Sequence, residues 1–318
     1  ASPERIVVGA GTQQITSHLS RILLKMGIRL VSLEAPGYLP VQSMFRDAGF
    51  TISHIPVARD GIEIAKLPTN IPSAVYVNPS NQFPTGAVMP IGRRYEILDW
   101  AAENNSIIIE DDYDSEFRYS GRLIMPLFAD DASDKVIYLN AFSKTMVPSL
   151  RISYMVLPPK LLARYVDTMS FYSCTVSSFE QYALARFIDE GHLERHINRT
   201  RNFYRRQREA VLREIAQSPL AEISHVEERN AGTHFLLYVR TSLTHDQARQ
   251  RGAEQGLNIS LFNDYLLRDG DGLSERTTKR FEQYSNGETA LVLNYAGIEP
   301  DRLSETVRRL ACVFPECE

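Results

Sequence analysis

Short apolar runs alternate with amphipathic segments through the first half of the chain, and this alternation limits the fold more than any other feature. Runs at residues 6–8, 74–77 and 107–109 have the length and composition of buried strands. Segments such as residues 12–26 lie between them, with apolar side chains at helical spacing. Strands separated by helices pair in parallel. The sequence therefore predicts an α/β fold with a large, mostly parallel sheet and helices on both faces.

The pattern changes in the last third of the chain. A long arginine-rich helix is predicted from Gly191 to Ile215, and strand patterns at 234–239 and 290–295 follow it. We therefore predict a large domain at residues 1–195 and a smaller α+β domain at residues 196–318. Residues 268–273 have the composition of a flexible loop.

Composition excludes several classes of protein. The 318 residues are 43% hydrophobic and 23% charged, as in ordinary globular proteins, and the net charge of -4 gives no general attraction for nucleic acid. Three cysteines without metal spacing favour a reducing compartment, so we expect a cytoplasmic protein. No apolar run is long enough to cross a membrane. His192 and His196 stand one helical turn apart, but no third ligand accompanies them, so we expect no metal site.

A lysine and an arginine seven residues apart, Lys144 and Arg151, follow the apolar run 136–139. A lysine amine can form a Schiff base with an aldehyde, and a guanidinium group binds phosphate oxygens as a planar double donor. Pyridoxal 5'-phosphate (PLP) carries both groups, so the spacing indicates this cofactor, with Lys144 as the catalytic lysine. Taken alone, a Ser-Lys pair after a strand is more often a loop lysine in solvent.

A glycine-rich turn at Gly9–Gly11 joins the first predicted strand to a helix. The free backbone N–H groups at such a helix start bind phosphate, and the Thr12 hydroxyl can add a donor. The alternative is a tight turn without a ligand.

Two loops after later strands carry side chains that suit a flat aromatic ring. Tyr38 follows a Pro-Gly turn and can stack on a heteroaromatic ring, although a half-buried loop tyrosine is the alternative. Asn81 lies in a stiff loop with prolines on both sides, from which its amide can hydrogen-bond a phenolic oxygen.

Four acidic residues crowd the end of the strand at 107–109, within the run Glu110-Asp111-Asp112-Tyr113-Asp114. They would repel one another in a common pocket, so at least one is expected to meet a buried positive charge, such as a protonated pyridine nitrogen. Strand alternation sends Asp111 and Asp112 to opposite faces, and we choose Asp111, with Tyr113 as a donor to the ring oxygen. The alternative is an acidic surface loop. All of these candidates follow strand ends, where open α/β sheets bind ligands.

The chain resembles the fold type I PLP aminotransferases, and in particular the aminotransferase-like domain of the MocR/GabR regulators of bacterial transcription. Four motifs carry the resemblance, which covers essentially the full length: residues 79–86, 110–119, 142–151 and 191–196. It implies that Lys144 binds the cofactor and that Asp111 pairs with the pyridine nitrogen. It assigns further neighbours of the cofactor: Tyr113 and Asn81 near the ring hydroxyl, Tyr38 stacked on the ring, and Gly11, Thr12, Gln13 and Arg151 around the phosphate.

Two positions depart from that pattern. Ala141 stands where the family has a serine or threonine for the phosphate, which implies the loss of one donor. Val292 stands where the resemblance leads us to expect an arginine for the carboxylate of an amino acid. Without that arginine, ordinary transamination of α-amino acids is doubtful.

The resemblance implies an effector-sensing domain of a GntR/MocR-type regulator, responding to PLP itself or to an amino compound that forms an external aldimine. Alternatives are a working aminotransferase and a domain used only for dimerisation. A homodimer is expected. Family members carry a winged helix-turn-helix ahead of this domain. The chain starts without a methionine, so we expect a piece of a longer protein whose DNA contacts lie in the missing part.

Overall fold

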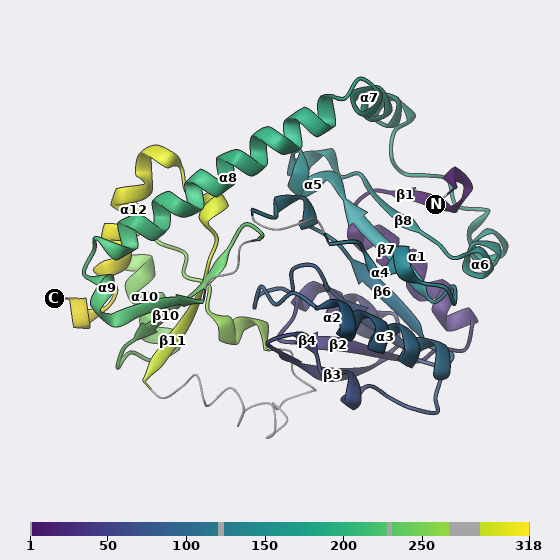
Figure 1. Ribbon diagram of the computed structural model, residues 1–318, viewed down its shortest axis with the longest axis horizontal. Coiled ribbons are helices and arrows are strands. Elements are labelled where there is room, and N and C mark those ends of the chain that lie inside the picture. The colour runs from purple at the N-terminus through teal and green to yellow at the C-terminus, as the bar shows by residue number, and fades with distance from the viewer. Residues whose placement is uncertain (1, 120–123, 228–230, 267–286, 318) are drawn as a thin grey trace. The chain divides into compact units, whose positions relative to one another are not determined.

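A computed structural model describes residues 2–119, 124–227, 231–266 and 287–317, and the chain divides into two compact units (Figure 1). The first unit comprises Ala1–Phe83, Ala87–Glu116 and Arg122–Arg199, and the second comprises Pro84–Gly86, Phe117–Gly121 and Thr200–Glu318. The domain boundary between residues 195 and 196 stays a prediction. The loop predicted at 268–273 lies outside the described residues.

An eight-stranded sheet forms the centre of the first unit, in the order β1-β8-β7-β6-β5-β2-β3-β4. The strands are β1 (Ile6–Gly9), β2 (Leu30–Ala35), β3 (Thr51–Ala58), β4 (Gly61–Ile62), β5 (Ala74–Val77), β6 (Ile107–Asp111), β7 (Val136–Ala141) and β8 (Ser153–Val156). The central pairs from β3 to β7 are parallel, whereas β8 is antiparallel to both β7 and β1, and β4 is antiparallel to β3. The predicted α/β fold is confirmed, with a sheet that is parallel at its centre and antiparallel at its ends.

Helices cover this sheet, which explains why its central strands are apolar on both sides. They are α1 (Thr12–Lys25), α2 (Leu39–Asp47), α3 (Ile91–Glu103), α4 (Leu127–Asp130), α5 (Phe142–Thr145), α6 (Pro159–Met169) and α7 (Ser178–Asp189). Single-turn 3-10 helices are η1 (Pro3–Arg5), η2 (Ile64–Lys66), η3 (Ser115–Phe117) and η4 (Pro148–Leu150). All four residues of β5 are buried, as are the three isoleucines of β6. A strand covered on both faces shows such a continuous apolar run instead of alternation.

Helix α1 illustrates how the sequence determines packing. Its buried apolar side chains, Ile15, Leu19, Ile22 and Leu23, recur at helical spacing and face the sheet, where α1 contacts β1, β7 and β8. Burial of each such side chain contributes about 1.5–3 kcal/mol. Gly27, at φ +83°, follows the helix and allows the chain to turn away from it.

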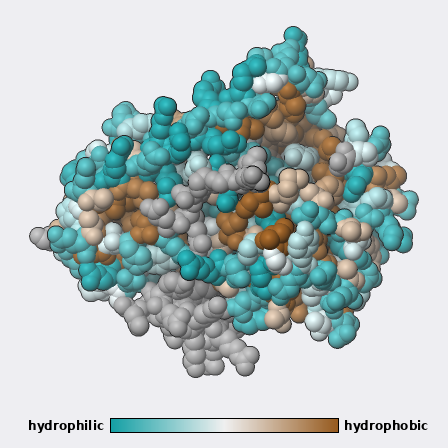
Figure 2. All heavy atoms as spheres, viewed as in Figure 1, coloured by the Kyte–Doolittle hydropathy of each residue, from teal (hydrophilic) through white to brown (hydrophobic). Residues whose placement is uncertain are grey.

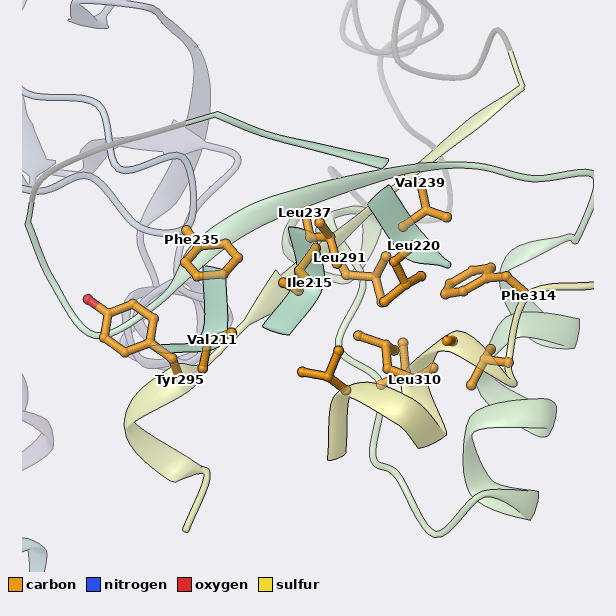
Figure 3. Close-up of a cluster of buried hydrophobic side chains, with 14 of the residues drawn as sticks. Val211, Ile215, Leu220, Phe235, Leu237, Val239, Leu291, Tyr295, Leu310 and Phe314 are labelled. Atoms are coloured by element: carbon orange, nitrogen blue, oxygen red, sulfur yellow. The ribbon is translucent and has the colours of Figure 1, made fainter. Parts of the chain in front are cut away.

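The second unit has its own three-stranded antiparallel sheet, in the order β11-β10-β9. Its elements are β9 (Ser224–Glu227), β10 (Phe235–Arg240), β11 (Glu288–Leu293), α9 (Leu220–Ile223), α10 (His245–Glu254), α12 (Leu303–Ala311), η5 (Phe262–Tyr265), η7 (Tyr295–Gly297), η8 (Pro300–Arg302) and η9 (Pro315–Cys317). Phe235, Leu237 and Val239 alternate along β10 and point into one apolar cluster with Leu310 and Phe314 (Figure 3). The smaller α+β domain predicted from the sequence is confirmed, since this unit contains both strands and helices.

Helix α8 (His192–Ala216) is 25 residues long and corresponds to the predicted arginine-rich helix. Val211 and Ile215 bury their side chains in the core of the second unit, and the surface along the helix is largely hydrophilic (Figure 2). Within the described ranges no helix, α8 included, combines the length and the apolar composition needed to span a bilayer.

Candidate cofactor-binding site

The predicted site residues all belong to the first unit and lie where its strands end. Gly11, Thr12 and Gln13 follow β1, Tyr38 follows β2, Asn81 follows β5, Asp111 and Tyr113 stand at and after the end of β6, and Lys144 follows β7. Because β8 runs opposite to β7, the start of β8 lies at the same edge, and Arg151 stands just before it. Chain order and strand direction thus place the nine residues along one edge of the sheet.

Asp111 is held by polar neighbours from the adjacent strand. The hydroxyl of Tyr76 donates to Asp111 Oδ2, and Asn78 Nδ2 donates to the main-chain oxygen of Asp111 (2.8 Å). Burial raises the pKa of Asp111 to about 6; the Asp112 carboxylate adds to the rise and the hydrogen bond from Tyr76 opposes it. A buried carboxylate of this kind gains stability from a nearby cation, as the predicted pairing with a pyridine nitrogen requires.

The neighbouring acidic residues make other contacts. Asp112 Oδ2 accepts hydrogen bonds from the hydroxyls of Ser115 and Tyr138, both at 2.8 Å. Glu110 accepts from the main-chain N–H groups of Leu127 (2.8 Å) and Phe128 (3.0 Å), at the start of α4. Glu110 and Asp112 thus hold the surrounding chain in place, which explains why so many carboxyl groups share one strand end.

Asn81, Tyr113 and Asp114 form one hydrogen-bonded group. Tyr113 donates its hydroxyl to the main-chain oxygen of Asn81 (3.0 Å), and Asn81 Nδ2 donates to Asp114 Oδ2 (2.8 Å) and Oδ1 (3.0 Å). Asn81 Oδ1 is buried and has no hydrogen-bond partner among the described residues. In this orientation the Asn81 side chain presents its oxygen, a hydrogen-bond acceptor, to a ligand. The predicted hydrogen bond between Asn81 and a phenolic oxygen does not specify which of the two groups is the donor.

Lys144 lies on the single turn of α5, directly after β7, and its side chain is exposed. Burial raises the pKa of Asp114 well above its usual range, and the positive charge of Lys144 acts in the opposite direction. Lys144 and Asp114 are therefore close enough to interact electrostatically, which links the lysine to the group around Asn81.

Gly11 and Arg151 come together at the start of α1. Gly11 has φ +88°, and a Cβ atom at this position would lie 2.7 Å from Arg151 Cζ, so the guanidinium group lies against bare backbone. Arg151 itself has a left-handed conformation, with φ +51°. The first N–H groups of a helix have no partners within it, so these groups and the arginine beside them form a corner suited to an anion. Thr12 is half-buried and Gln13 is exposed at the same helix start.

Tyr38 lies at the start of α2 and is 53% exposed. Its ring meets Phe83 edge to face, with 6.1 Å between ring centroids. The exposed ring remains accessible for stacking with a planar ligand.

Arg94, on α3, fastens the loop that carries Asn81. It is 1% exposed, and its guanidinium group donates to the carbonyl oxygens of Met89 (2.9 Å), Pro79 (3.0 Å) and Met125 (2.7 Å). The main-chain N–H of Met89 also donates to Pro79 (2.9 Å). Both ends of the loop are thus attached to the same buried side chain.

These residues fit PLP on structural grounds. A phosphate would find the corner formed by Gly11 and Arg151, where any side chain at residue 11 would collide. A ring substituent would satisfy the buried oxygen of Asn81, and a cationic ring nitrogen would offset the raised pKa of Asp111.

Sequence reasoning missed the polar residues behind the site. Tyr76, Asn78 and Glu34 lie within or just after the strands β5 and β2, where they look like isolated polar residues in apolar runs. A buried polar residue near the end of a parallel strand was the available signal. The sequence marks Asp114 only as a member of the acidic run.

Ligand-free protein should lose stability as the pH rises from about 5 to 8. Burial raises the pKa of Glu34 to about 8 and that of Glu110 to about 7, from an ordinary value of 4.5. A carboxyl group with a higher pKa in the folded state binds more protons there, so its stabilisation is complete below the unfolded pKa and is lost as the pH passes the folded pKa. We expect the free energy of unfolding to fall by an amount on the order of a few kcal/mol across this window.

Urea unfolding at pH 5, 6, 7 and 8 measures this fall. Glu110→Gln should remove its own share of the fall between pH 5 and 7 and leave the shares of Asp111, whose pKa burial raises to about 6, and of Glu34, nearer pH 8. Stability that stays constant or rises across the window would contradict the burial of these groups.

A family model described as "Aminotransferase class I and II" matches residues 1–290. The chain belongs to the aminotransferase class I and II family. The resemblance read from the motifs is confirmed by this match.

Curated relatives of this aminotransferase class I and II domain include bacterial regulators. The chain is 40% identical over 257 residues to an uncharacterized HTH-type transcriptional regulator, YdeL, of Bacillus subtilis, covering 81% of this chain and 55% of the regulator. It is 32% identical over 314 residues to the probable rhizopine catabolism regulatory protein MocR of Rhizobium meliloti, covering 98% and 60%. The chain thus spans little more than half the length of these relatives, and the predicted similarity to MocR-type regulators is confirmed.

Solved structures with this fold include enzymes. LysN, the α-aminoadipate aminotransferase of Thermus thermophilus, complexed with N-(5'-phosphopyridoxyl)-L-leucine, matches with a TM-score of 0.79 at 22% identity, covering 98% of this chain and 77% of LysN. At this identity the match shows the fold. The family match and the ligand of this neighbour support pyridoxal phosphate as the cofactor of the domain.

Proposed function

We propose that this domain binds PLP through Lys144 and serves as the effector-sensing and oligomerisation part of a bacterial GntR/MocR-type transcription regulator. The observation that carries the proposal is the 40% identity to a regulator over 81% of the chain, together with a lysine, an arginine and a buried carboxylate at one sheet edge. The effector is PLP itself or an amino compound that reacts with it.

Each residue has a distinct part in holding the cofactor. Lys144 provides the amine for covalent attachment, and Arg151 with the backbone at Gly11, Thr12 and Gln13 binds the phosphate. The bound cofactor supplies an aldehyde that captures amines and a ring that withdraws electrons.

The ring is held by the remaining residues. Asp111 keeps the proton on the pyridine nitrogen, because its carboxylate gains stability from that positive charge. Tyr38 covers one face of the ring, and Asn81 and Tyr113 bind the ring hydroxyl.

Val292 stands at the position where the resemblance leads us to expect an arginine for an effector's carboxylate. It lies on β11, 8% exposed, and its main-chain N–H donates to the carbonyl oxygen of Ser260 (2.9 Å). A valine cannot bind a carboxylate, so a charge-assisted hydrogen bond worth about 1.5–3 kcal/mol is missing. The proposal therefore favours PLP alone, or an amine recognised without that contact, over an ordinary α-amino acid.

The second candidate function is catalysis by a working aminotransferase, which the fold neighbours favour. An absorbance titration of the purified domain with PLP, then with a panel of amino donors, separates the two functions. A sensor should take up PLP and give little or no pyridoxamine phosphate. Sustained turnover with any donor would favour the enzyme, and a protein that takes up no PLP would contradict both.

A homodimer is part of the proposal, and exposed aromatic side chains on α7 support it. Phe179 is 81% exposed and Tyr182 is 77% exposed in the single chain, and Phe171, shortly before the helix, is 74% exposed. Large aromatic side chains in such positions favour a protein partner.

Replacing both α7 aromatics, Phe179→Ser with Tyr182→Ser, should weaken the dimer. Loss of two aromatic anchors should raise the dimer dissociation constant by about 30-fold or more. Sedimentation equilibrium measures it, with Tyr95→Ser as the control, since Tyr95 is 52% exposed on α3. Equal effects of the two replacements would place the interface elsewhere.

DNA binding in this proposal belongs to the winged helix-turn-helix domain that is predicted ahead of this chain. The net charge of -4 agrees with a domain that does not itself bind DNA. We propose a cytoplasmic location, where such a regulator meets both its effector and DNA.

A further inference from the structure

Glu34 is a buried carboxyl group to which the proposed function gives no part. It is the fifth residue of β2 and only 4% exposed. Glu34 Oε2 accepts a hydrogen bond from the main-chain N–H of Asn78 (3.2 Å). Buried glutamates are uncommon, and each requires a reason.

Asn78 connects this carboxyl group to Asp111. Its main-chain N–H is bound by Glu34, and its side-chain Nδ2 donates to the main-chain oxygen of Asp111 (2.8 Å). Tyr76, two residues earlier in the chain, donates its hydroxyl to Asp111 Oδ2. The three contacts cross from β2 through β5 to β6, which are neighbours in the sheet.

The surroundings of Glu34 disfavour its ionised form. Its titratable neighbours are Asp111, Tyr76 and Tyr113, and Gln82 adds a neutral amide. None of these groups is a cation, and Asp111 adds a like charge. Burial makes a carboxylate costly and raises the pKa of Glu34 to about 8, although the hydrogen bonds from the Asn78 main chain and the Gln82 side chain oppose the rise.

We propose that Glu34 is a positioning residue for Asp111: a neutral carboxylic acid that holds the Asn78 backbone, so that Asn78 fixes the Asp111 main chain. The cofactor's ring nitrogen then meets the Asp111 carboxylate in a set position, and Glu34 adds no negative charge behind it. The inference rests on the proposed function, because it assigns Asp111 to the ring nitrogen.

Two substitutions separate a neutral acid from a carboxylate. Glu34→Gln keeps a neutral side chain with an oxygen that accepts from Asn78, whereas Glu34→Ala removes the acceptor. We expect Glu34→Gln to bind PLP at pH 7 within about twofold of the wild type, and Glu34→Ala to bind about tenfold more weakly. Glu103→Ala, an exposed glutamate at the end of α3, is the control for loss of a negative charge.

The apparent pKa of the bound chromophore, measured by pH titration, is a readout that a change in stability alone does not shift. Glu34→Ala should shift its apparent pKa by about half a unit or more, because Asp111 is displaced from the ring, and Glu34→Gln should leave it within the error of the wild type at neutral pH. Circular dichroism confirms that each variant is folded. If Glu34→Ala does not fold, Glu34→Gln still distinguishes a neutral Glu34 from an ionised one.

Three results would overturn the proposal. They are a loss of affinity in Glu34→Gln as large as in Glu34→Ala, wild-type behaviour of a folded Glu34→Ala, and a chromophore pKa that neither variant moves. Failure of the proposed function looks different, since the wild type itself would then take up no PLP, or Lys144→Ala would bind it unchanged.

Discussion

Replacement of Lys144 by alanine should abolish the yellow, lysine-linked chromophore and lower the affinity for PLP by at least about 100-fold, because the covalent bond to the protein is lost. Lys144 is exposed on α5, at the sheet edge where Gly11, Asp111 and Arg151 also lie, so its removal leaves the fold intact. Absorbance titration measures the loss.

Lys160→Ala is the matched control, since Lys160 is also exposed but lies on α6. Borohydride reduction and peptide mass analysis give a second, direct measurement: the adduct should be found on the peptide that contains Lys144. An adduct on another lysine, or a chromophore that survives in Lys144→Ala, would remove the basis of the proposed function.

Gly11→Ala should weaken PLP binding by about tenfold to 100-fold, because it displaces Arg151, which we propose binds the phosphate. The new Cβ would lie 2.7 Å from Arg151 Cζ, so the guanidinium group must move. Affinity for pyridoxal, which lacks the phosphate, should change little. The ratio of the two affinities is therefore the decisive measurement.

Gly27→Ala controls for backbone strain. Gly27 has φ +83°, close to the +88° of Gly11, but a Cβ there has no neighbour within 4 Å. Both substitutions should cost about 1–3 kcal/mol of stability, with Gly11→Ala at the upper end, since φ +88° with ψ 160° is a conformation open almost only to glycine. Only Gly11→Ala should lose the preference for the phosphorylated ligand. Equal losses in both variants would show that strain, and not the phosphate corner, is responsible.

The fold could be predicted because its information is local. Apolar runs such as those of β5 and β6, with helical spacing between them, fix strands and helices within short stretches. The direction of β8 was harder, because strand pairing brings together residues far apart in the chain. Residues 142–152 between β7 and β8 are too few for the usual crossover helix, and this length is the signal that β8 turns back.

The site could be predicted only in outline. The chemistry of their side chains indicates Lys144 and Asp111, and the rule that ligands of open α/β sheets bind where the strands end supports both. The role of each acidic residue depends on hydrogen-bond partners from other strands, such as Tyr138 for Asp112 and Tyr76 for Asp111. The contacts of these side chains across the sheet have no local signature.

The buried guanidinium of Arg94 has a consequence for how tightly a ligand can be held. Because the carbonyl oxygens of Pro79 and Met89 both accept hydrogen bonds from Arg94, the loop around Asn81 is held in one conformation without a ligand. A preformed loop loses little conformational freedom on binding, so most of the interaction energy remains available as affinity. A domain built this way can bind scarce ligand without first having to order the loop.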